Sequence, residues 1–275
     1  MADVAVITGG ASGFGLALAA RCAVRGLDLA LLDLDGARAE AEARSLADAH
    51  GVAVTSMEVD VADAVSVAAA AAAVEDRFGR ADLVVSNVGV QLFGALDRLT
   101  DDEWRWVLDV NVIGSARVAR AFVPLLRRTK GRLAFTTSSS VLDPAARLGV
   151  YQASKFAVWG LAETLRLELA GDGIGVSVIF PSGMISRHLE TSGAAQPDHL
   201  RRPVADDDDL SAMFTSNPAM ADALATPDDA ARPVLDALLA GEPYVITHGD
   251  LVDAVDARAA QLHRAADLAR ASADG

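Results

Sequence analysis

The stretch "VAVITGGASGFG", residues 4–15, joins a short run of β-branched apolar residues to a glycine-rich turn. The apolar run predicts a buried strand at residues 4–8, and the residues after the turn predict a helix at 14–25. Glycines at such a turn let the backbone approach a pyrophosphate, and a helix N-terminus offers free N–H groups and a positive dipole end. A glycine-rich turn alone is a weak signal, because tight strand-to-helix turns need glycine in any case. Its position between a strand and a helix makes it a candidate nucleotide-binding loop.

The rest of the chain repeats this alternation of strand and helix. Its apolar runs are continuous, which is typical of parallel strands that are covered on both faces. We therefore predict an α/β fold with a doubly wound parallel sheet of the Rossmann type and helices on both faces. Strands are predicted at residues 4–8, 29–33, 52–60, 81–87, 132–138, 175–180 and 244–247. Helices are predicted at residues 14–25, 36–49, 63–78, 101–128, 151–170, 227–241 and 250–270.

One segment interrupts the alternation. Residues 183–228 are polar, contain prolines and are long enough for a functional loop, so we expect a substrate lid there. Within it the four aspartates at 206–209 predict a solvated loop, because like charges repel. The 275 residues fit one domain, 1–275, that ends in a C-terminal strand and helix at 243–275.

Composition excludes several classes of function. The net charge of −14 argues against nucleic acid or an anionic membrane as a partner, because both attract basic faces. The longest apolar stretch, residues 65–74, is about half of the roughly 20 residues that a membrane span requires. Cys22 is the only cysteine, so it has no partner for an internal disulfide or a metal site. The chain opens directly into a strand, which leaves no room for a signal peptide. We expect a soluble cytoplasmic protein without metal.

Tyr151 and Lys155 lie four positions apart in the apolar helical stretch "VYQASKFAVWG", residues 150–160. Residues i and i+4 are neighbours on a helix, so the phenol and the ammonium must lie close together. One interpretation is structural: the tyrosine ring packs in the core and the lysine snorkels to water. The other is functional, because burying a cation beside a phenol costs free energy unless the pair performs chemistry.

Asp33 ends the second predicted strand, 18 residues beyond Gly15. A carboxylate at this point can accept hydrogen bonds from both ribose hydroxyls of NAD and would repel the 2′-phosphate of NADP. Asp33 could instead be a surface residue at the start of a turn, since Asp35 and Gly36 follow it. The glycine loop upstream favours the ribose contact.

Five motifs together occur in the order and spacing of the short-chain dehydrogenases/reductases, which the chain resembles over nearly its whole length. Ser138 lies 13 residues before Tyr151, as in that family, and this spacing selects it over Ser139 and Ser140. The motifs are Thr8–Gly15, Asn87-Val88-Gly89, Asn111, Ser138 and Tyr151-x-x-x-Lys155.

The resemblance implies a dinucleotide cofactor, and two details are similar to the members that prefer NAD. Leu34 rather than arginine follows Asp33, and Ser12 stands where NADP users often carry a basic residue. Asp60-Val61 is similar to the family's adenine-side contact. The cofactor residues that the resemblance implies are Gly9, Ser12, Gly13, Phe14, Gly15, Asp33, Asp60, Val61, Asn87, Gly89, Tyr151, Lys155, Pro181, Gly183, Met184 and Ile185.

The resemblance also implies hydride transfer between a small alcohol or ketone substrate and the nicotinamide. Tyrosine titrates near 10 in water, and we expect the Lys155 ammonium and the positive nicotinamide ring to lower that pKa. Tyr151 would then exchange a proton with the substrate oxygen, while Lys155 would also bond the nicotinamide ribose. Ser138 would hold the substrate oxygen, and Asn111 would anchor a water that links Lys155 to solvent.

The segment after the sixth strand departs from the family pattern. Pro181-Ser182-Gly183 stands where many members have Pro-Gly. Ser186 is nearest to the threonine that often binds the carboxamide, and the backbone of Met184 and Ile185 is the other candidate. We expect the basic residues of the lid to be exposed to solvent rather than to meet an anionic substrate: Arg187, His188, Arg201 and Arg202.

The residues expected around the nicotinamide are apolar, which favours a bulky hydrophobic secondary alcohol over a sugar. They are Val90, Leu92, Phe93, Val141, Leu142 and Leu148, with Met184, Leu189, Met213 and Phe214 from the lid. The closing stretch "YVITHGDLVDAVDARAAQL", residues 244–262, resembles a subgroup that includes aryl-alcohol dehydrogenases acting on lignin fragments.

Two alternative functions fit the sequence less well. A catalytically silent NAD-binding sensor or regulator would be expected to lack the tyrosine or the lysine, and both are present. A nucleotide-sugar epimerase or dehydratase would need a longer chain and G-x-x-G-x-x-G spacing, whereas the loop from Gly9 has G-x-x-x-G-x-G.

The resemblance further implies a homotetramer or homodimer built on the helices at 101–128 and 151–170. These segments carry apolar residues on more than one face, as a second buried surface requires. They include Trp106, Phe122, Phe156 and Trp159. The tryptophans, Trp104 among them, are expected in the core or an interface rather than at the substrate.

Overall fold

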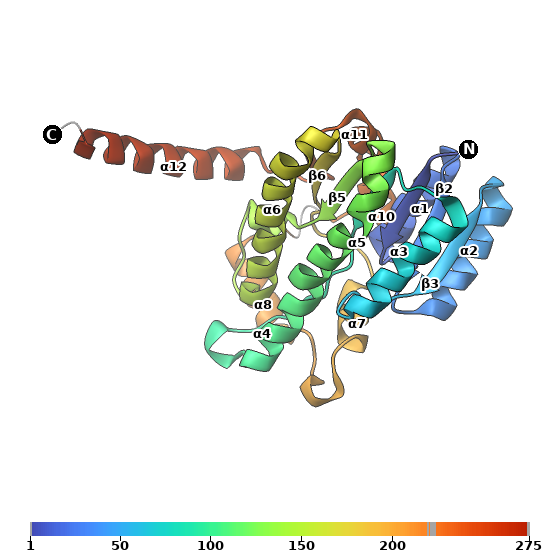
Figure 1. Cartoon of the computed structure of the whole chain (residues 1–275). Coiled ribbons are helices and arrows are strands. Elements are labelled where there is room, and N and C mark those ends of the chain that lie inside the picture. Colours follow the sequence, from blue (N-terminus) through green and yellow to red (C-terminus); the bar gives the residue numbers. More distant parts are fainter. Residues whose placement is uncertain (1, 219, 221–223, 274–275) are drawn as a thin grey trace.

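The computed structural model describes residues 2–218, 220 and 224–273, and seven parallel strands form its single sheet (Figure 1). The strands are β1 Val4–Thr8, β2 Asp28–Asp33, β3 Val54–Glu58, β4 Leu83–Ser86, β5 Arg132–Thr136, β6 Gly175–Phe180 and β7 Tyr244–Ile246. Their order across the sheet is β3-β2-β1-β4-β5-β6-β7, and every pairing is parallel. This confirms the predicted doubly wound fold. The order reverses between β1 and β4, which is where such sheets leave a crevice beyond the carboxyl ends of the strands.

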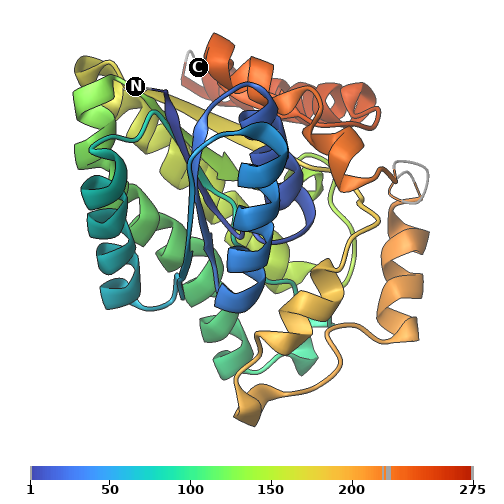
Figure 2. The same cartoon turned by 90° about the vertical axis from the view of Figure 1, so that its right-hand side faces the viewer.

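Helices cover both faces of the sheet. They are α1 Gly13–Val24, α2 Gly36–His50, α3 Ala64–Phe78, α4 Asp101–Leu108, α5 Gly114–Thr129, α6 Gly149–Leu169, α7 His188–Ala194, α8 Asp207–Ser216, α10 Pro227–Ala231, α11 Val234–Ala240 and α12 Val252–Ala273. One hydrophobic core joins the sheet to α3, α5 and α6, and the other joins it to α1, α2, α10 and α11. Figure 2 shows the sheet nearly edge-on, with α3 on one side and α2 on the other. Among the described residues, none of the helices is both long and apolar enough to cross a membrane.

Two predicted helices are interrupted. The segment predicted at 101–128 forms α4 and α5, which are joined by a π-helical turn at Asp109–Ile113. Such a turn inserts a residue into the helix and is frequent at functional sites. The segment predicted at 227–241 divides into α10 and α11 at Pro233, which has no N–H to continue the helical hydrogen bonds.

The lid contains helices and is fastened to the body. Phe93 donates its backbone N–H to Val204 at 2.8 Å, and Arg202 forms an ion pair with the buried Glu103. The prediction of a loop at residues 206–209 is wrong, although Asp206, Asp207 and Asp208 are exposed as expected and only Asp209 is buried. Asp206 caps α8 by accepting the backbone N–H of Asp209 at 2.7 Å, since aspartate is a favoured N-cap residue.

Candidate active site

The glycine loop between β1 and α1 is shaped to receive an anion. Gly9 and Gly13 have positive φ angles of 64° and 52°, which favour glycine. A Cβ at Gly15 would lie 2.1 Å from the carbonyl oxygen of Gly9, so the close approach of α1 to the loop requires glycine there as well. The side chain of Ser12, at the N-cap, makes no capping hydrogen bond, and the first turn of α1 has no acidic residue. Its N–H groups and dipole therefore remain available to a phosphate.

Asn87 braces this loop from the end of β4. Its Nδ2 donates to the carbonyl oxygen of Thr8 at 3.1 Å, and its Oδ1 accepts from the Thr136 hydroxyl at 3.1 Å. The backbone N–H of Asn87 also donates to the Thr8 hydroxyl at 2.9 Å. Asn87 thus ties together the carboxyl ends of β1, β4 and β5, so its amide positions the loop even though the residue lines the cavity.

Asp33 lies at the carboxyl end of β2, beside the glycine loop. Its Oδ2 accepts the backbone N–H of Ala11 at 3.0 Å, and its Oδ1 accepts that of Asp35 at 3.1 Å. Arg38, which sequence reasoning missed, donates from Nε to the carbonyl oxygen of Ala11 at 2.8 Å. Asp60 is held in a similar way, since its Oδ1 accepts the backbone N–H of Ala62 at 2.8 Å. These carboxylates are oriented by backbone amides rather than left free at the surface.

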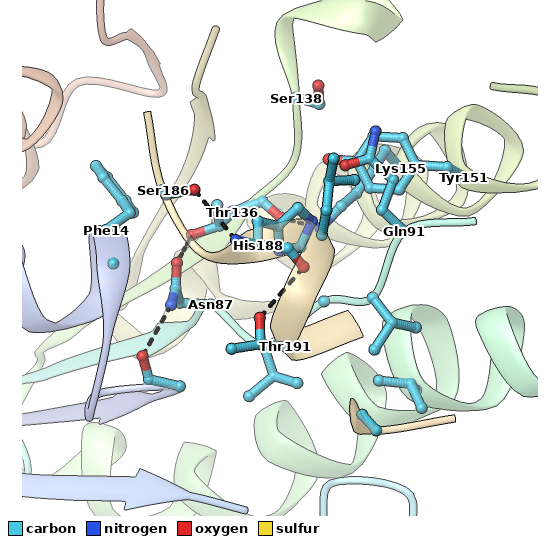
Figure 3. A pocket seen from close by; sticks show the side chains of 18 of the residues that line it. Phe14, Asn87, Gln91, Thr136, Ser138, Tyr151, Lys155, Ser186, His188 and Thr191 are labelled. Carbon is cyan, nitrogen blue, oxygen red and sulfur yellow. Dashed lines mark hydrogen bonds between the residues drawn. The ribbon is translucent and has the colours of Figure 1, made fainter. Parts of the chain in front are cut away.

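One cavity of about 850 Å³ extends from the glycine loop to Tyr151 and the lid (Figure 3). Its dimensions, the open glycine loop and the uncapped helix end fit a dinucleotide. The predicted cofactor residues that line it are Gly9, Ser12, Gly13, Phe14, Gly15, Asp33, Asp60, Val61, Asn87, Gly89, Tyr151, Lys155, Pro181, Gly183 and Met184.

Ile185 is placed differently from the prediction. Its side chain is 67% exposed and is not part of the cavity lining. Its backbone N–H already donates to the carbonyl oxygen of Ala225 at 3.0 Å, so it is not free to bond a carboxamide. Ser186 does line the cavity, and its hydroxyl accepts the backbone N–H of His188 at 3.4 Å.

Tyr151 and Lys155 are neighbours on α6, and both are buried, with 8% and 3% exposure. The Lys155 Nζ lies 5.7 Å from the centroid of the Tyr151 ring and donates to the carbonyl oxygen of Thr136 at 3.0 Å. Lys155 therefore points inward, and the snorkelling interpretation is wrong. Figure 3 shows the two side chains together at the inner end of the cavity.

Burial displaces the pKa values of both groups toward their neutral forms. Desolvation raises the pKa of the Tyr151 phenol to about 12, although its hydrogen bond with Ser138 acts in the opposite direction. Desolvation lowers the pKa of the Lys155 ammonium to about 8. In the protein by itself, burial outweighs the lowering of the tyrosine pKa that we expected from Lys155.

Gly89 makes room for Lys155. A Cβ at this position would lie 2.8 Å from Lys155 Nζ and 3.5 Å from Asn111 Oδ1. The first of these separations is closer than side chains normally approach, so any larger residue would displace the ammonium. The structure thus explains both polar and small residues of the motif at 87–89. Asn87 holds the ends of three strands together, and Gly89 leaves space for the Lys155 ammonium.

Ser138 follows β5 and caps the short 3₁₀ turn Ser139–Val141, where its Oγ accepts the backbone N–H of Ser140 at 3.2 Å. Ser138 and Ser139 line the cavity. Ser140 is buried away from it, and among the described residues its hydroxyl has no hydrogen-bond partner. The structure thus places Ser138 beside Tyr151, as the spacing predicts.

Asn111 lies in the π-helical turn, behind the cavity rather than on its lining. Its Oδ1 accepts the backbone N–H of Val90 at 2.7 Å, and its Nδ2 donates to the Val90 carbonyl oxygen at 2.9 Å and to Ser154 Oγ at 2.8 Å. These bonds fix the loop after β4 against α6. The water that we expect Asn111 to anchor stays a prediction, since Oδ1 accepts one hydrogen bond and can accept a second.

The basic residues of the lid do not share one environment, contrary to our expectation. His188 begins α7 and lies in the cavity, with its ring centroid 6.4 Å from that of Tyr151. Burial, with a smaller effect from Lys155, lowers the pKa of His188 to about 4. Arg202 pairs with Glu103, whereas Arg187 and Arg201 are exposed, as predicted.

The apolar lining differs from the prediction, since it also includes residues that were not expected there, such as Trp106, Leu200 and Leu210. Leu92, Val141 and Leu142 are not part of it, because Leu92 and Val141 are buried in the cores and Leu142 packs against one of them. The predicted residues that do line the cavity are Val90, Phe93, Leu148, Met184, Leu189, Met213 and Phe214.

His248, which no sequence motif indicated, supports the loop after β6. Its Nε2 lies 2.9 Å from the carbonyl oxygen of Gly183, and its Nδ1 lies 2.7 Å from the Thr247 hydroxyl. Ser182 Oγ donates to the His248 carbonyl oxygen at 2.9 Å. The signal was absent from the sequence because the contact joins segments 65 residues apart.

Comparison with known proteins agrees with this geometry. Residues 3–197 match the family model of the short chain dehydrogenases. A crystal structure of a short chain dehydrogenase/reductase from Burkholderia phymatum in complex with NAD superposes with a TM-score of 0.85 and 30% identity, covering 95% of this chain and 94% of that one.

Two relatives in sequence give the same result. An 11-beta-hydroxysteroid dehydrogenase from Sesamum indicum is 32% identical over 88% of this chain and 67% of its own length. An NAD-dependent oxidoreductase from Mycobacterium tuberculosis is 37% identical over 123 residues, which are 44% of this chain and only 45% of that protein. The chain belongs to the short-chain dehydrogenase/reductase family of oxidoreductases.

Proposed function

We propose that this protein transfers a hydride between a secondary alcohol or ketone and the nicotinamide of NAD, with Tyr151 as the acid/base. The observation that carries the proposal is the convergence of Tyr151, Lys155 and Ser138 at one end of a cavity whose other end is the glycine loop. NAD, when bound along this cavity, would supply the hydride acceptor. The glycine loop, Asp33 and Lys155 would hold it, because all of them line this cavity.

Each residue near the reacting atoms has a proposed role. Tyr151 takes the proton from the substrate hydroxyl, or returns it in the reverse direction. Ser138 donates a hydrogen bond to the substrate oxygen and orients it toward the phenol. Lys155 favours the phenolate by its charge, at a position fixed by Gly89 and by Thr136. Asn111 is proposed as a positioning residue, since its side chain bonds Val90 and Ser154 and so holds the loop after β4 against α6.

NAD rather than NADP is the proposed cofactor. The Asp33 carboxylate lies at the end of β2, where its charge would repel a 2′-phosphate, and neither Leu34 nor Ser12 supplies a compensating cation. The names of the Burkholderia and Mycobacterium proteins both include NAD. A reducing, cytoplasmic compartment is also proposed, because Cys22 is the only cysteine.

The proposed substrate is a bulky hydrophobic secondary alcohol or its ketone. Apolar side chains from the loop after β4 and from the lid surround the reacting end of the cavity. The Sesamum relative carries a steroid in its name, and a hydroxysteroid is an alcohol of this kind. The neutral imidazole of His188 adds one polar group to an otherwise apolar wall.

A homotetramer or homodimer remains a proposal, but the residues expected at its interface change. Trp106 and Phe122 lie in the cores and cannot cover a second copy, because they are 8% and 0% exposed. Large apolar residues of the same segments that stay exposed are Ile113, Phe156 and Leu167. These are the side chains that we expect at an interface on α6 and on the π-helical turn before α5.

The test is a panel of alcohols with NAD, in which turnover is followed by NADH absorbance, for the wild type and Tyr151→Phe. We expect a loss of at least about a hundredfold in kcat for the variant with unchanged NAD affinity. Tyr244→Phe is the matched control, because Tyr244 is the only other tyrosine and lies on the exposed edge strand. A Tyr151→Phe variant that keeps more than about a tenth of the wild-type kcat would contradict the assignment of Tyr151 as the acid/base. A wild type that binds NAD but converts no alcohol or ketone would favour the sensor.

A further inference from the structure

Helix α12 leaves the body of the protein, as Figure 1 shows. Arg258 anchors its first turns, since Nη1 donates to the carbonyl oxygen of Val141 at 2.6 Å and the guanidinium lies 5.5 Å from the centroid of the Phe156 ring. Beyond this anchor, every residue from 259 to 272 is exposed. A helix of this length is marginally stable in water by itself, so a covering surface would stabilise it.

The sequence of α12 contains a regular apolar stripe. Apolar residues recur at alternating spacings of three and four, which is the pattern of a coiled-coil seam. The α12 seam, as we call this stripe, consists of Val252, Val255, Ala259, Leu262, Ala266 and Ala269. Val252 and Leu262 are 64% and 66% exposed, although neither needs contact with water. The half-buried residues Leu251, Ala254 and Arg258 precede seam positions by one residue, so the seam lies about 100° around the helix from the body.

The charges of α12 are divided along its length. The residues up to 257 carry only negative charges, at Asp250, Asp253 and Asp256. The residues from 258 to 273 carry Arg258, Arg264 and Arg270 against one carboxylate, Asp267, and Asp274 follows in the sequence. Two such helices in parallel would oppose like charges at each end. An antiparallel pair would place the acidic half of each helix along the basic half of the other.

We propose that α12 pairs in antiparallel orientation with α12 of a second copy of this chain, through the α12 seam. The seam spacing fits a two-fold axis between residues 260 and 261, and such an interface is self-complementary. It forms layers of Val252 with Ala269, Val255 with Ala266, and Ala259 with Leu262, each of which occurs twice. Asp256 then lies level with Ala265 of the second copy, between the levels of Arg264 and Arg270 in its basic half. The small alanines let the two helix backbones approach closely.

The first experiment compares Leu262→Asp with Leu268→Asp by light scattering across a concentration series. Both leucines are exposed, at 66% and 71%, so neither change should affect folding, but only Leu262 belongs to the seam. We expect Leu262→Asp to raise the dissociation constant at least about a hundredfold and halve the mass, because two leucines leave each interface. Leu268→Asp should keep the wild-type mass. Equal masses for wild type and Leu262→Asp would overturn the proposal.

The second experiment fixes the orientation by cross-linking under mild oxidation. An equimolar mixture of Val255→Cys and Ala266→Cys chains should give a covalent heterodimer on a non-reducing gel, since residues 255 and 266 share a layer of the antiparallel pair. Val255→Cys is the control, because identical seam residues are adjacent only in a parallel pair. Cys22 contributes no background, since it is fully buried and burial raises its pKa to about 12. Cross-linking of Val255→Cys by itself, without a covalent heterodimer in the mixture, would refute the antiparallel pair.

Discussion

The two ends of the cavity hold their polar groups by different means. At the glycine loop, the carboxylate of Asp33 is half-exposed and accepts two backbone N–H groups. At the other end, Tyr151 and Lys155 are buried, and burial favours the neutral form of each. The hydrogen bonds of Asp33 therefore stabilise the cofactor-free fold, whereas the burial of Tyr151 and Lys155 costs free energy of desolvation.

This difference explains where the protein depends on tertiary contacts. The glycine loop is defined by residues adjacent in sequence, with φ angles that only glycine adopts easily. The positions of Tyr151 and Lys155 depend on Gly89 and Thr136, which come from separate loops at the ends of β4 and β5. Substitutions at the catalytic end should therefore reveal whether the burial is functional, and one at the binding end provides the comparison. The four substitutions follow in order of expected effect.

Gly89→Ala should have the largest effect. The added Cβ would lie 2.8 Å from Lys155 Nζ and must displace the ammonium from Tyr151. We expect kcat to fall by about a hundredfold or more, because misplacement of a catalytic group by an ångström has that cost. Gly160→Ala on α6 is the control, since its Cβ would meet nothing within 4 Å. Equal kcat values for the two variants would show that the space beside Gly89 is not required to position Lys155.

Asp33→Ala tests the binding end. Two negative groups in hydrogen-bonding distance should cost on the order of 2–4 kcal/mol, so the wild type should prefer NAD over NADP roughly thirty- to thousandfold in kcat/KM. The alanine variant should lose most of this preference, chiefly through weaker use of NAD. Adding Leu34→Arg should then begin to favour NADP, because a guanidinium can pair with the phosphate. Equal use of both cofactors by the wild type would show that Asp33 does not select between them.

Lys155→Met should stabilise the cofactor-free protein while it reduces activity. The pKa of Lys155 falls from 10.5 to about 8 on folding, so the unfolded state binds more protons between these values and stability rises with pH across that window. Below about pH 8 the full cost applies, roughly 3 kcal/mol. After loss of the hydrogen bond to Thr136, we expect a gain of about 1–3 kcal/mol in the free energy of unfolding at pH 7.

Denaturant titrations of both proteins at pH 7 and at pH 10 measure this effect. The advantage of Lys155→Met should be largest at pH 7 and should shrink toward pH 10, since the lysine is then neutral in the folded state and begins to lose its proton in the unfolded state. A variant that is less stable than the wild type at pH 7 would mean that burial of Lys155 carries no such cost.

Ser186→Ala should have the smallest effect. Its hydroxyl faces the cavity and accepts only a long hydrogen bond of 3.4 Å from His188. Because Ile185 has no free N–H, Ser186 is the remaining side chain near the predicted carboxamide position. Loss of one hydrogen bond predicts an increase of about three- to tenfold in KM for NAD with little change in kcat. No change in KM would indicate that the backbone of Met184, and not Ser186, bonds the carboxamide.

The sequence was sufficient for features that depend on neighbouring residues. Continuous apolar runs predicted the parallel sheet, and the i to i+4 spacing predicted the Tyr151–Lys155 pair. It was insufficient where a distant segment decides the environment. Asn111 lies in a π-helical turn that periodicity does not indicate, and its partners are Val90 and Ser154. His188 and His248 are placed by the folding of the lid and the C-terminal strand, which no local pattern reports.

The pKa of the Tyr151 phenol with and without NAD tests the account most directly. Ultraviolet absorbance of tyrosinate follows it, and the spectrum of Tyr151→Phe removes the contribution of Tyr244, the only other tyrosine. Without NAD, Tyr151 should titrate with a pKa of about 12, because burial dominates. With NAD, the positive charge of the nicotinamide ring should lower that pKa by several units, toward neutrality. A pKa that stays near 12 when NAD is bound would contradict Tyr151 as the base.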